Sequence, residues 1–215
     1  MNRSVRTIVA TAGLLALIAP ATGSADDKND DRPLRIKLSG FNEVLAPSLN
    51  AATAQPPAVL TAGAGAVFST GSGRLTLKID RQNRMIEYEL TYEFPDATQP
   101  ALPSTQFVNQ AHLHFGQKHT TGAINVWLCQ SADTPAPQAV VTITPTCPSP
   151  SGTVIGTITP AKVLALADPV GFPGGENGFD ALLEALRNDA IYGNVHTDKS
   201  PAGEIRGQFR DHGHD

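Results

Sequence analysis

Two runs of alternating residues in the first half of the chain constrain the fold most strongly. In residues 74–80 (RLTLKID), Leu75, Leu77 and Ile79 alternate with polar residues. The same pattern returns in residues 85–94 (MIEYELTYEF), after the polar segment 81–84 (RQNR). Side chains of a β-strand point alternately to its two faces, so a period of two indicates two half-buried strands. The polar segment between them predicts a β-hairpin.

Further segments of strand character follow the same logic. They are residues 34–38, 107–115, 123–129, 153–158, 192–196 and 203–209, and residues 140–144 are a candidate short strand. Helical spacing occurs only late, in residues 179–188, and Thr159-Pro160 favours a second short helix over 161–167. The sequence therefore predicts a mainly β domain, an antiparallel sandwich or barrel, with one or two short helices inserted before the last two strands.

The first 25 residues have the three parts of a secretory signal peptide. Arg3 and Arg6 precede an uncharged apolar run, 8–19, which breaks at Pro20 and ends in small residues up to Ala25. The apolar run is shorter than the roughly 20 residues that a membrane-spanning helix needs. We therefore expect 1–25 to be a signal peptide, with an uncleaved anchor as the alternative, and the protein to be secreted or periplasmic. No later segment is apolar enough to span a membrane.

We expect residues 26–33 to form a charged flexible segment between this signal and the folded domain. Over the whole chain, 16 basic residues stand against 20 acidic ones. Nucleic-acid-binding proteins normally carry a basic patch or stripe, so this balance argues against a nucleic-acid partner.

The chain has two cysteines, Cys129 and Cys147, both outside the predicted signal peptide. An oxidising compartment would join them in a disulfide bond. The alternative is a thiol-based metal or redox site, but their spacing is far from that of a CxxC motif. We therefore expect a disulfide.

The histidines are the one group of residues in the sequence that is suited to binding a metal ion. His112 and His114 lie two apart on an expected strand, so their rings share a face, and His196 shares its face with Asn194 on a later strand. Three neutral imidazoles suit Zn²⁺ or Cu²⁺. Around them, Glu204 would complete the site or hold a ring nitrogen, with Arg206 and Asn194 also in the surrounding shell.

Two other interpretations of these residues stay open. The histidines are also compatible with a structural polar network, in which Glu204 and Arg206 pair with each other or with a ring, or with contact to another ligand. His119 is expected to be exposed in a turn. His212 and His214 belong to the tail 211–215, which we expect to be frayed.

Four motifs, taken in order, point to one family. They are Leu38-Ser39-Gly40 with Asn42-Glu43-Val44, the segment 111–116 (AHLHFG), the helix-to-strand segment 179–192, and 193–197 (GNVHT) with 202–208 (AGEIRGQ). Over residues 34–210 the chain resembles the CHRD (chordin-type) domain, which occurs in chordin and in many bacterial secreted proteins. The resemblance implies an immunoglobulin-like β fold of extracellular type without an established enzymatic activity.

Two common hydrolase motifs are missing from the sequence. It contains no GxSxG elbow and no HExxH helix. Copper–zinc superoxide dismutase also carries HxH on a β-sandwich, but that chemistry needs more ligands than His112, His114 and His196. We therefore expect a non-enzymatic binding or structural module that contacts a protein or a surface ligand. The alternative is a protein that binds copper or zinc through the histidines.

Overall fold

The computed structural model describes residues 32–45, 65–95 and 107–210, all of which belong to one compact unit, 31–215. The predicted signal peptide 1–25, most of the charged segment 26–33 and the tail 211–215 lie outside the described residues. No helix within the described ranges combines the length and the apolar character needed to cross a membrane.

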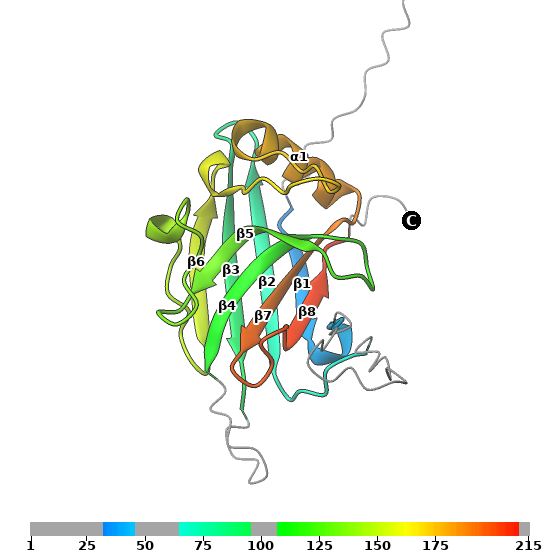
Figure 1. The fold of residues 1–215 in the computed structure, drawn as a ribbon, viewed down its shortest axis with the longest axis vertical. Helices are drawn as coiled ribbons and strands as arrows, with labels where there is room; N and C mark the ends of the chain where they lie inside the picture. Colours follow the sequence, from blue (N-terminus) through cyan, green and yellow to red (C-terminus); the bar gives the residue numbers. More distant parts are fainter. Residues whose placement is uncertain (1–31, 46–64, 96–106, 211–215) are drawn as a thin grey trace, which may run out of the picture. The chain divides into compact units, whose positions relative to one another are not determined.

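The described chain forms one eight-stranded sheet in which all neighbouring strands are antiparallel, and Figure 1 shows how strongly it curls. In space the strands follow the order β5-β4-β7-β8-β1-β2-β3-β6. Their bounds are β1 Leu34–Ser39, β2 Ser72–Asp80, β3 Met85–Glu93, β4 Val108–Phe115, β5 Ala123–Gln130, β6 Gly152–Ile158, β7 Ile191–Thr197 and β8 Ile205–Gln208. The predicted mainly β, antiparallel fold is confirmed, and of the two alternatives the curled single sheet is nearer to a barrel.

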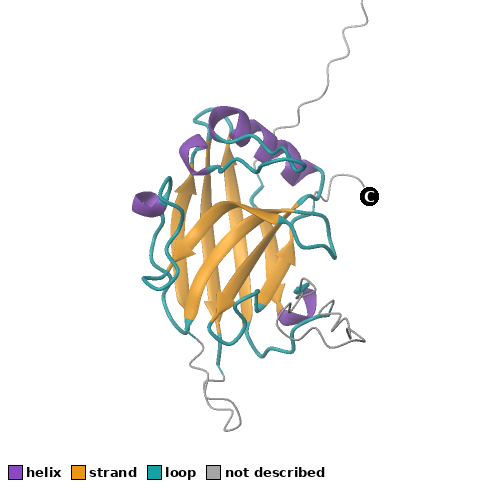
Figure 2. Cartoon of the chain, viewed as in Figure 1, coloured by secondary structure: helices purple, strands orange, loops and turns teal. Residues whose placement is uncertain are grey.

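One helix, α1 (Gly175–Arg187), lies across one end of the sheet, as Figure 2 shows. Its apolar residues Phe179, Leu182, Leu183 and Leu186 recur at helical spacing and are all buried. The polar face of the helix contacts the tip of the β2–β3 hairpin. There the Arg84 guanidinium forms salt bridges with the carboxylates of Glu176 and Asp180, each with an N–O distance of 2.9 Å. The predicted helix before the last two strands is therefore confirmed.

Two local expectations were wrong. Residues 161–167 form only the short 3-10 turn η4 (Pro160–Lys162), because the following backbone bonds to other segments: Leu164 N–H donates to Asn125 O, and Leu166 N–H donates to Phe172 O. Residues 140–144 contain a second 3-10 turn, η3 (Val141–Ile143), rather than a strand. The Val140 N–H donates to Pro137 O within that segment, so no strand ladder forms there.

The concave side of the sheet holds the core. Because side chains alternate along each strand, every second residue points into this core. Examples that are 2 % exposed or less are Leu75 and Leu77 from β2, Tyr88 and Leu90 from β3, and Leu113 from β4. The 3-10 turn η1 (Gly40–Asn42) follows β1 directly and is capped by the Ser39 side chain, which accepts from the Phe41 N–H. The opposite, outer face is where the polar side chains of the strands gather.

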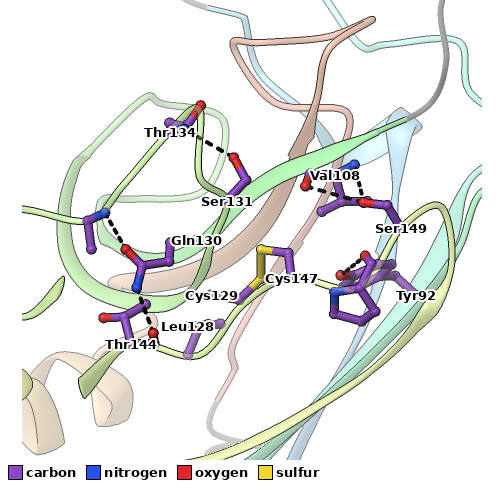
Figure 3. The surroundings of a disulfide bond; sticks show 12 residues. Tyr92, Val108, Leu128, Cys129, Gln130, Ser131, Thr134, Thr144, Cys147 and Ser149 are labelled. Carbon is purple, nitrogen blue, oxygen red and sulfur yellow. Dashed lines mark hydrogen bonds between the residues drawn. A yellow bond between two sulfur atoms is a disulfide. The ribbon is translucent and has the colours of Figure 1, made fainter. Parts of the chain in front are cut away.

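The two edge strands of the sheet, β5 and β6, are tied together around the predicted disulfide (Figure 3). Cys129, near the end of β5, is bonded to Cys147, which precedes β6. From β3, the Tyr88 hydroxyl donates to Leu128 O at 2.7 Å and the Tyr92 hydroxyl donates to Pro148 O at 2.6 Å. These bonds connect β3 to the chain on both sides of the disulfide, and closing the loop between the cysteines stabilises by about 3 kcal/mol in the chain-entropy model.

Candidate metal centre

The ladder between β4 and β7 gathers the three histidines. His112 lies opposite Asn194, His114 opposite Tyr192, and Gln110 opposite His196. The intervening residues Ala111 and Leu113 point into the core, so the histidines occupy the outer face of the sheet. The 111–116 and 193–197 segments are therefore neighbours in the sheet.

The three rings lie close together and away from solvent. Their ligand atoms are all within 4.8 Å of one another. Ring centroids are 5.4 Å apart for His112–His114 and 4.9 Å apart for His112–His196. His112 is 0 % exposed, and His114 and His196 are 6 % exposed each. Residues on the outer face of a sheet are normally exposed to solvent. The burial of these three histidines therefore shows that loops cover this part of the sheet.

Two backbone carbonyls fix the orientation of two rings. His114 Nδ1 lies 3.0 Å from Gly122 O, and His196 Nδ1 lies 2.9 Å from Pro201 O. A carbonyl oxygen only accepts, so each Nδ1 carries the proton and each Nε2 is left with a lone pair. Neither Nε2 has a hydrogen-bond partner among the described residues, and both ring nitrogens of His112 are also unpartnered there.

Burial sets the charge state of the rings. It lowers the pKa of His112 well below its ordinary value, with the neighbouring His196 and His114 adding to the effect. Burial likewise lowers the pKa of His114 to about 4, against a raising contribution from its bond to Gly122. The pKa of His196 is lowered for the same reason and raised in part by Pro201. All three imidazoles are therefore neutral near pH 7, the form that ligates a metal.

Aromatic side chains pack directly against the cluster. Trp127, which pairs with His112 across the β4–β5 ladder, contacts that ring edge-on with centroids 4.3 Å apart. Trp127 is itself covered by Ala136 and Val140 from the chain that follows β5. The sequence gives no signal for this contact, because the covering segment shows no periodicity.

The residues that were expected to surround the three histidines, Asn194, Glu204 and Arg206, have different roles in the structure. Asn194 is buried beside His112, with its Oδ1 unpartnered among the described residues. Glu204 does not bond to a ring nitrogen, which was one of the two roles expected of it. Instead it accepts from the hydroxyls of Ser69 and Thr197. Thr197 in turn accepts from the Ser200 N–H at 3.1 Å, so Glu204 supports the loop that carries Pro201 O.

Arg206 also acts through a loop. Its guanidinium donates to Thr120 O at 2.7 Å and to Gln117 O at 3.2 Å. These bonds hold the β4–β5 loop, whose Gly122 O orients His114. Arg206 and Glu204 do not pair with each other in a salt bridge within the described chain. The two charged residues therefore brace the two loops that fix the rings.

A buried carboxyl group beside Asn194 was missed. Glu43 is 3 % exposed, and burial raises its pKa to about 7, although Val44, Arg206 and Asn194 act in the opposite direction. Its Oε2 lacks a hydrogen-bond partner in the described residues. The sequence marked Glu43 only as part of the Asn42-Glu43-Val44 motif, because a single acidic residue after a strand gives no signal of burial.

The remaining histidines do not join the cluster. His119 is exposed in the β4–β5 loop, as expected, with a positive φ of 65°. His212 and His214 lie outside the described residues. Among the described histidines, only His112, His114 and His196 therefore meet in one place.

Comparison with known proteins adds the family. The sequence model of the CHRD domain matches residues 34–209, which is nearly the whole described domain. Searches of curated proteins and of solved structures each found no significant match. The match covers all eight strands, α1 and the three clustered histidines. The chain belongs to the CHRD domain family.

Proposed function

We propose that this protein binds one transition-metal ion, copper or zinc, through His112, His114 and His196. One observation carries the proposal: three buried imidazoles bring ligand atoms within 4.8 Å of one another, with the Nε2 atoms of His114 and His196 unpartnered among the described residues. Three nitrogen ligands leave one coordination position open in a tetrahedral site.

A metal ion explains this geometry better than a structural polar network does. Buried polar groups in proteins are nearly always hydrogen-bonded, and each unsatisfied one costs about 1–3 kcal/mol. A network would pair the rings with carboxylates, yet Glu204 bonds elsewhere, to Ser69 and Thr197. A bound cation would satisfy the free lone pairs together.

The orientation of the rings supports the same conclusion. Metal-ligating histidines commonly donate their other ring N–H to a carbonyl or carboxylate, which fixes the tautomer. Gly122 O and Pro201 O occupy this position for His114 and His196. Both loops are braced in turn, by Arg206 and by the Glu204–Thr197 pair.

For the protein as a whole we propose a secreted or periplasmic binding module rather than an enzyme. Membership of the CHRD family and the disulfide between Cys129 and Cys147 support export to an oxidising compartment. The partner would be a protein or a surface ligand, and the metal ion would stabilise or shape the outer face that it contacts.

Metal analysis of variants tests the metal centre. Purified protein is stripped with chelator, loaded with Cu²⁺ or Zn²⁺, desalted and assayed for bound metal. We expect one ion per chain in the wild type and in His119→Ala, and loss of that ion in His114→Ala and in His196→Ala. Near-ultraviolet circular dichroism checks that each variant keeps its fold.

The tail needs its own control, because His212 and His214 also offer imidazoles. The double variant His212→Ala/His214→Ala is expected to retain the ion. Retention of the ion in a folded His114→Ala protein, or its loss from the tail variant, would rule out the proposed site.

A further inference from the structure

A pocket of about 260 Å³ opens on the outer face of β1 and β8 and is lined mainly by cationic side chains. Arg35 and Lys37 come from β1, Lys118 from the β4–β5 loop, and Arg206 and Arg210 from β8 and the residues after it. The amides of Asn42 and Gln208 also line the pocket, and none of the described residues that line it is acidic. Five positive groups therefore surround one small volume.

This concentration of charge stands out against the chain, whose net charge is −4. The salt bridges between described residues join Lys78, Arg84 and Arg187 to their partners and involve none of the five pocket cations. Like charges held together repel, and a cleft lined by one sign of charge concentrates counter-ions. An anion in the pocket would relieve this repulsion.

The strand geometry explains why the cations converge. Alternation along β1 buries Ile36 and Leu38 and leaves Arg35 and Lys37 exposed on the outer face. Antiparallel pairing of β1 with β8 places Arg206 beside Ser39 on the same sheet. Arg206 is only 2 % exposed, and its bonds to Thr120 O and Gln117 O hold it rigidly. The pocket therefore has a fixed guanidinium and more mobile cations at its rim.

We propose that this pocket binds a small polyvalent oxyanion of the phosphate type. Guanidinium groups present planar N–H forks that match phosphate oxygens, and ammonium groups add point charge. Several cations around a small volume favour an anion that carries more than one negative charge. Such a group could come from free phosphate or diphosphate or from a phospholipid headgroup.

The anion pocket is separate from the metal centre and does not rest on the proposed function. None of the three clustered histidines lines it. Arg206 and the β4–β5 loop connect the two sites: the Arg206 guanidinium lies 3.3 Å from the Tyr192 ring centre, and the loop carries both Lys118 and Gly122. Metal-free protein can therefore be used to test anion binding alone, so a failure of one proposal is distinguishable from a failure of the other.

Calorimetric titration of metal-free protein with pyrophosphate, at constant ionic strength, is the test. We expect saturable binding that Arg35→Gln/Lys37→Gln weakens by about tenfold or more, because charge-assisted hydrogen bonds are lost. The double variant Lys78→Gln/Arg81→Gln removes the same charge from the exposed β2–β3 hairpin and is expected to leave the affinity unchanged. All four side chains are exposed, and melting curves check that the variants are folded.

Flotation with vesicles containing phosphatidic acid distinguishes the two phosphate sources. Vesicle binding that depends on Arg35 and Lys37, without pyrophosphate binding, supports the pocket and identifies a lipid headgroup. Absence of binding to both probes, or equal weakening by the two double variants, would overturn the proposal.

Discussion

His114 and Tyr192 lie directly opposite each other on β4 and β7, with their rings stacked 4.6 Å apart and nearly parallel, at 6°. Gly122 is hydrogen-bonded to both side chains: its N–H donates to the Tyr192 hydroxyl, and its carbonyl oxygen accepts from the N–H at His114 Nδ1. Arg206 covers the tyrosine ring from 3.3 Å. Stacking and hydrogen bonds thus hold His114 in one orientation from two directions.

Removing the Tyr192 hydroxyl tests this positioning. Tyr192→Phe keeps the stacked ring but leaves the Gly122 N–H without its acceptor, so the loop that orients His114 is loosened. We expect the affinity for copper or zinc to fall about tenfold, in the range found for residues that orient metal ligands. The free energy of unfolding should fall by about 1 kcal/mol.

Tyr88→Phe is the matched control for this variant. It also loses one hydrogen bond, from the Tyr88 hydroxyl to Leu128 O, but on the core side of the sheet. We expect a similar loss of stability with unchanged metal affinity. Equal metal affinities in the two variants would show that the Tyr192 hydroxyl does not position His114.

Replacing His112 by an apolar residue is expected to have opposite effects on the stability of the metal-free protein and on metal binding. Both of its ring nitrogens are buried and unpartnered within the described structure, so metal-free protein bears an unfavourable contribution. Replacing the ring by an apolar side chain removes that cost. His112→Leu is therefore expected to leave the metal-free protein as stable or up to about 2 kcal/mol more stable, while abolishing stabilisation by added metal.

Thermal melts with and without Zn²⁺ measure both effects. Leu113→Ala, one residue along but on the core side, is the contrast, and it should lose about 2–5 kcal/mol while still responding to metal. A His112→Leu protein that melts far below the wild type without metal would indicate that the ring is a structural residue.

Glu43 gives a pH dependence of definite sign. Its pKa is about 7 in the folded protein against an ordinary 4.5, so the folded state holds a proton that the unfolded state has released. Stability therefore falls as pH rises from about 4.5 to 7, by up to about 3 kcal/mol. Glu43→Gln removes this loss. The free energy of unfolding of the variant, relative to that of the wild type, is therefore expected to increase as pH rises from 5 to 8.

Denaturant unfolding at several pH values measures the difference between the two proteins. The clustered histidines titrate in both, so the difference isolates Glu43, whose carboxylate is favoured only in part by Arg206. Parallel stability curves for Glu43→Gln and the wild type would contradict the buried, raised carboxyl.

Gly203 occupies a position that excludes a side chain. Its φ is +121°, and a Cβ there would lie 2.5 Å from Glu43 Oε2. Gly203→Ala is expected to destabilise by about 1–3 kcal/mol, through backbone strain and displacement of Glu43. Gly65→Ala is the control, because a Cβ at Gly65 meets nothing within 4 Å. Equal melting temperatures of the two variants would be inconsistent with this explanation.

The strands and the histidine cluster were predictable because both depend on alternation. Period two identified β2 and β3, and it also placed His112 and His114 on one face. The position of His196 beside them depends on the pairing of β7 with β4, which periodicity does not report. What remained was the choice between a metal centre and a polar network, which depends on where Gly122 O, Pro201 O and Glu204 lie.

Other features depend on contacts between distant loops, which periodicity does not report. Residues 161–167 resemble a helix locally, but their N–H groups bond to Asn125 O and Phe172 O. The basic pocket combines side chains from β1, the β4–β5 loop and β8, which are far apart in the sequence. Both features therefore required the three-dimensional arrangement.

X-ray absorption spectroscopy of the copper- or zinc-loaded protein tests the metal centre most directly. We expect three imidazole nitrogens at about 2.0 Å from the metal, with one further ligand, and loss of one imidazole or of the ion in each of the three single His→Ala variants. A spectrum without imidazole scattering, or one unchanged in His112→Ala, His114→Ala and His196→Ala, would contradict it.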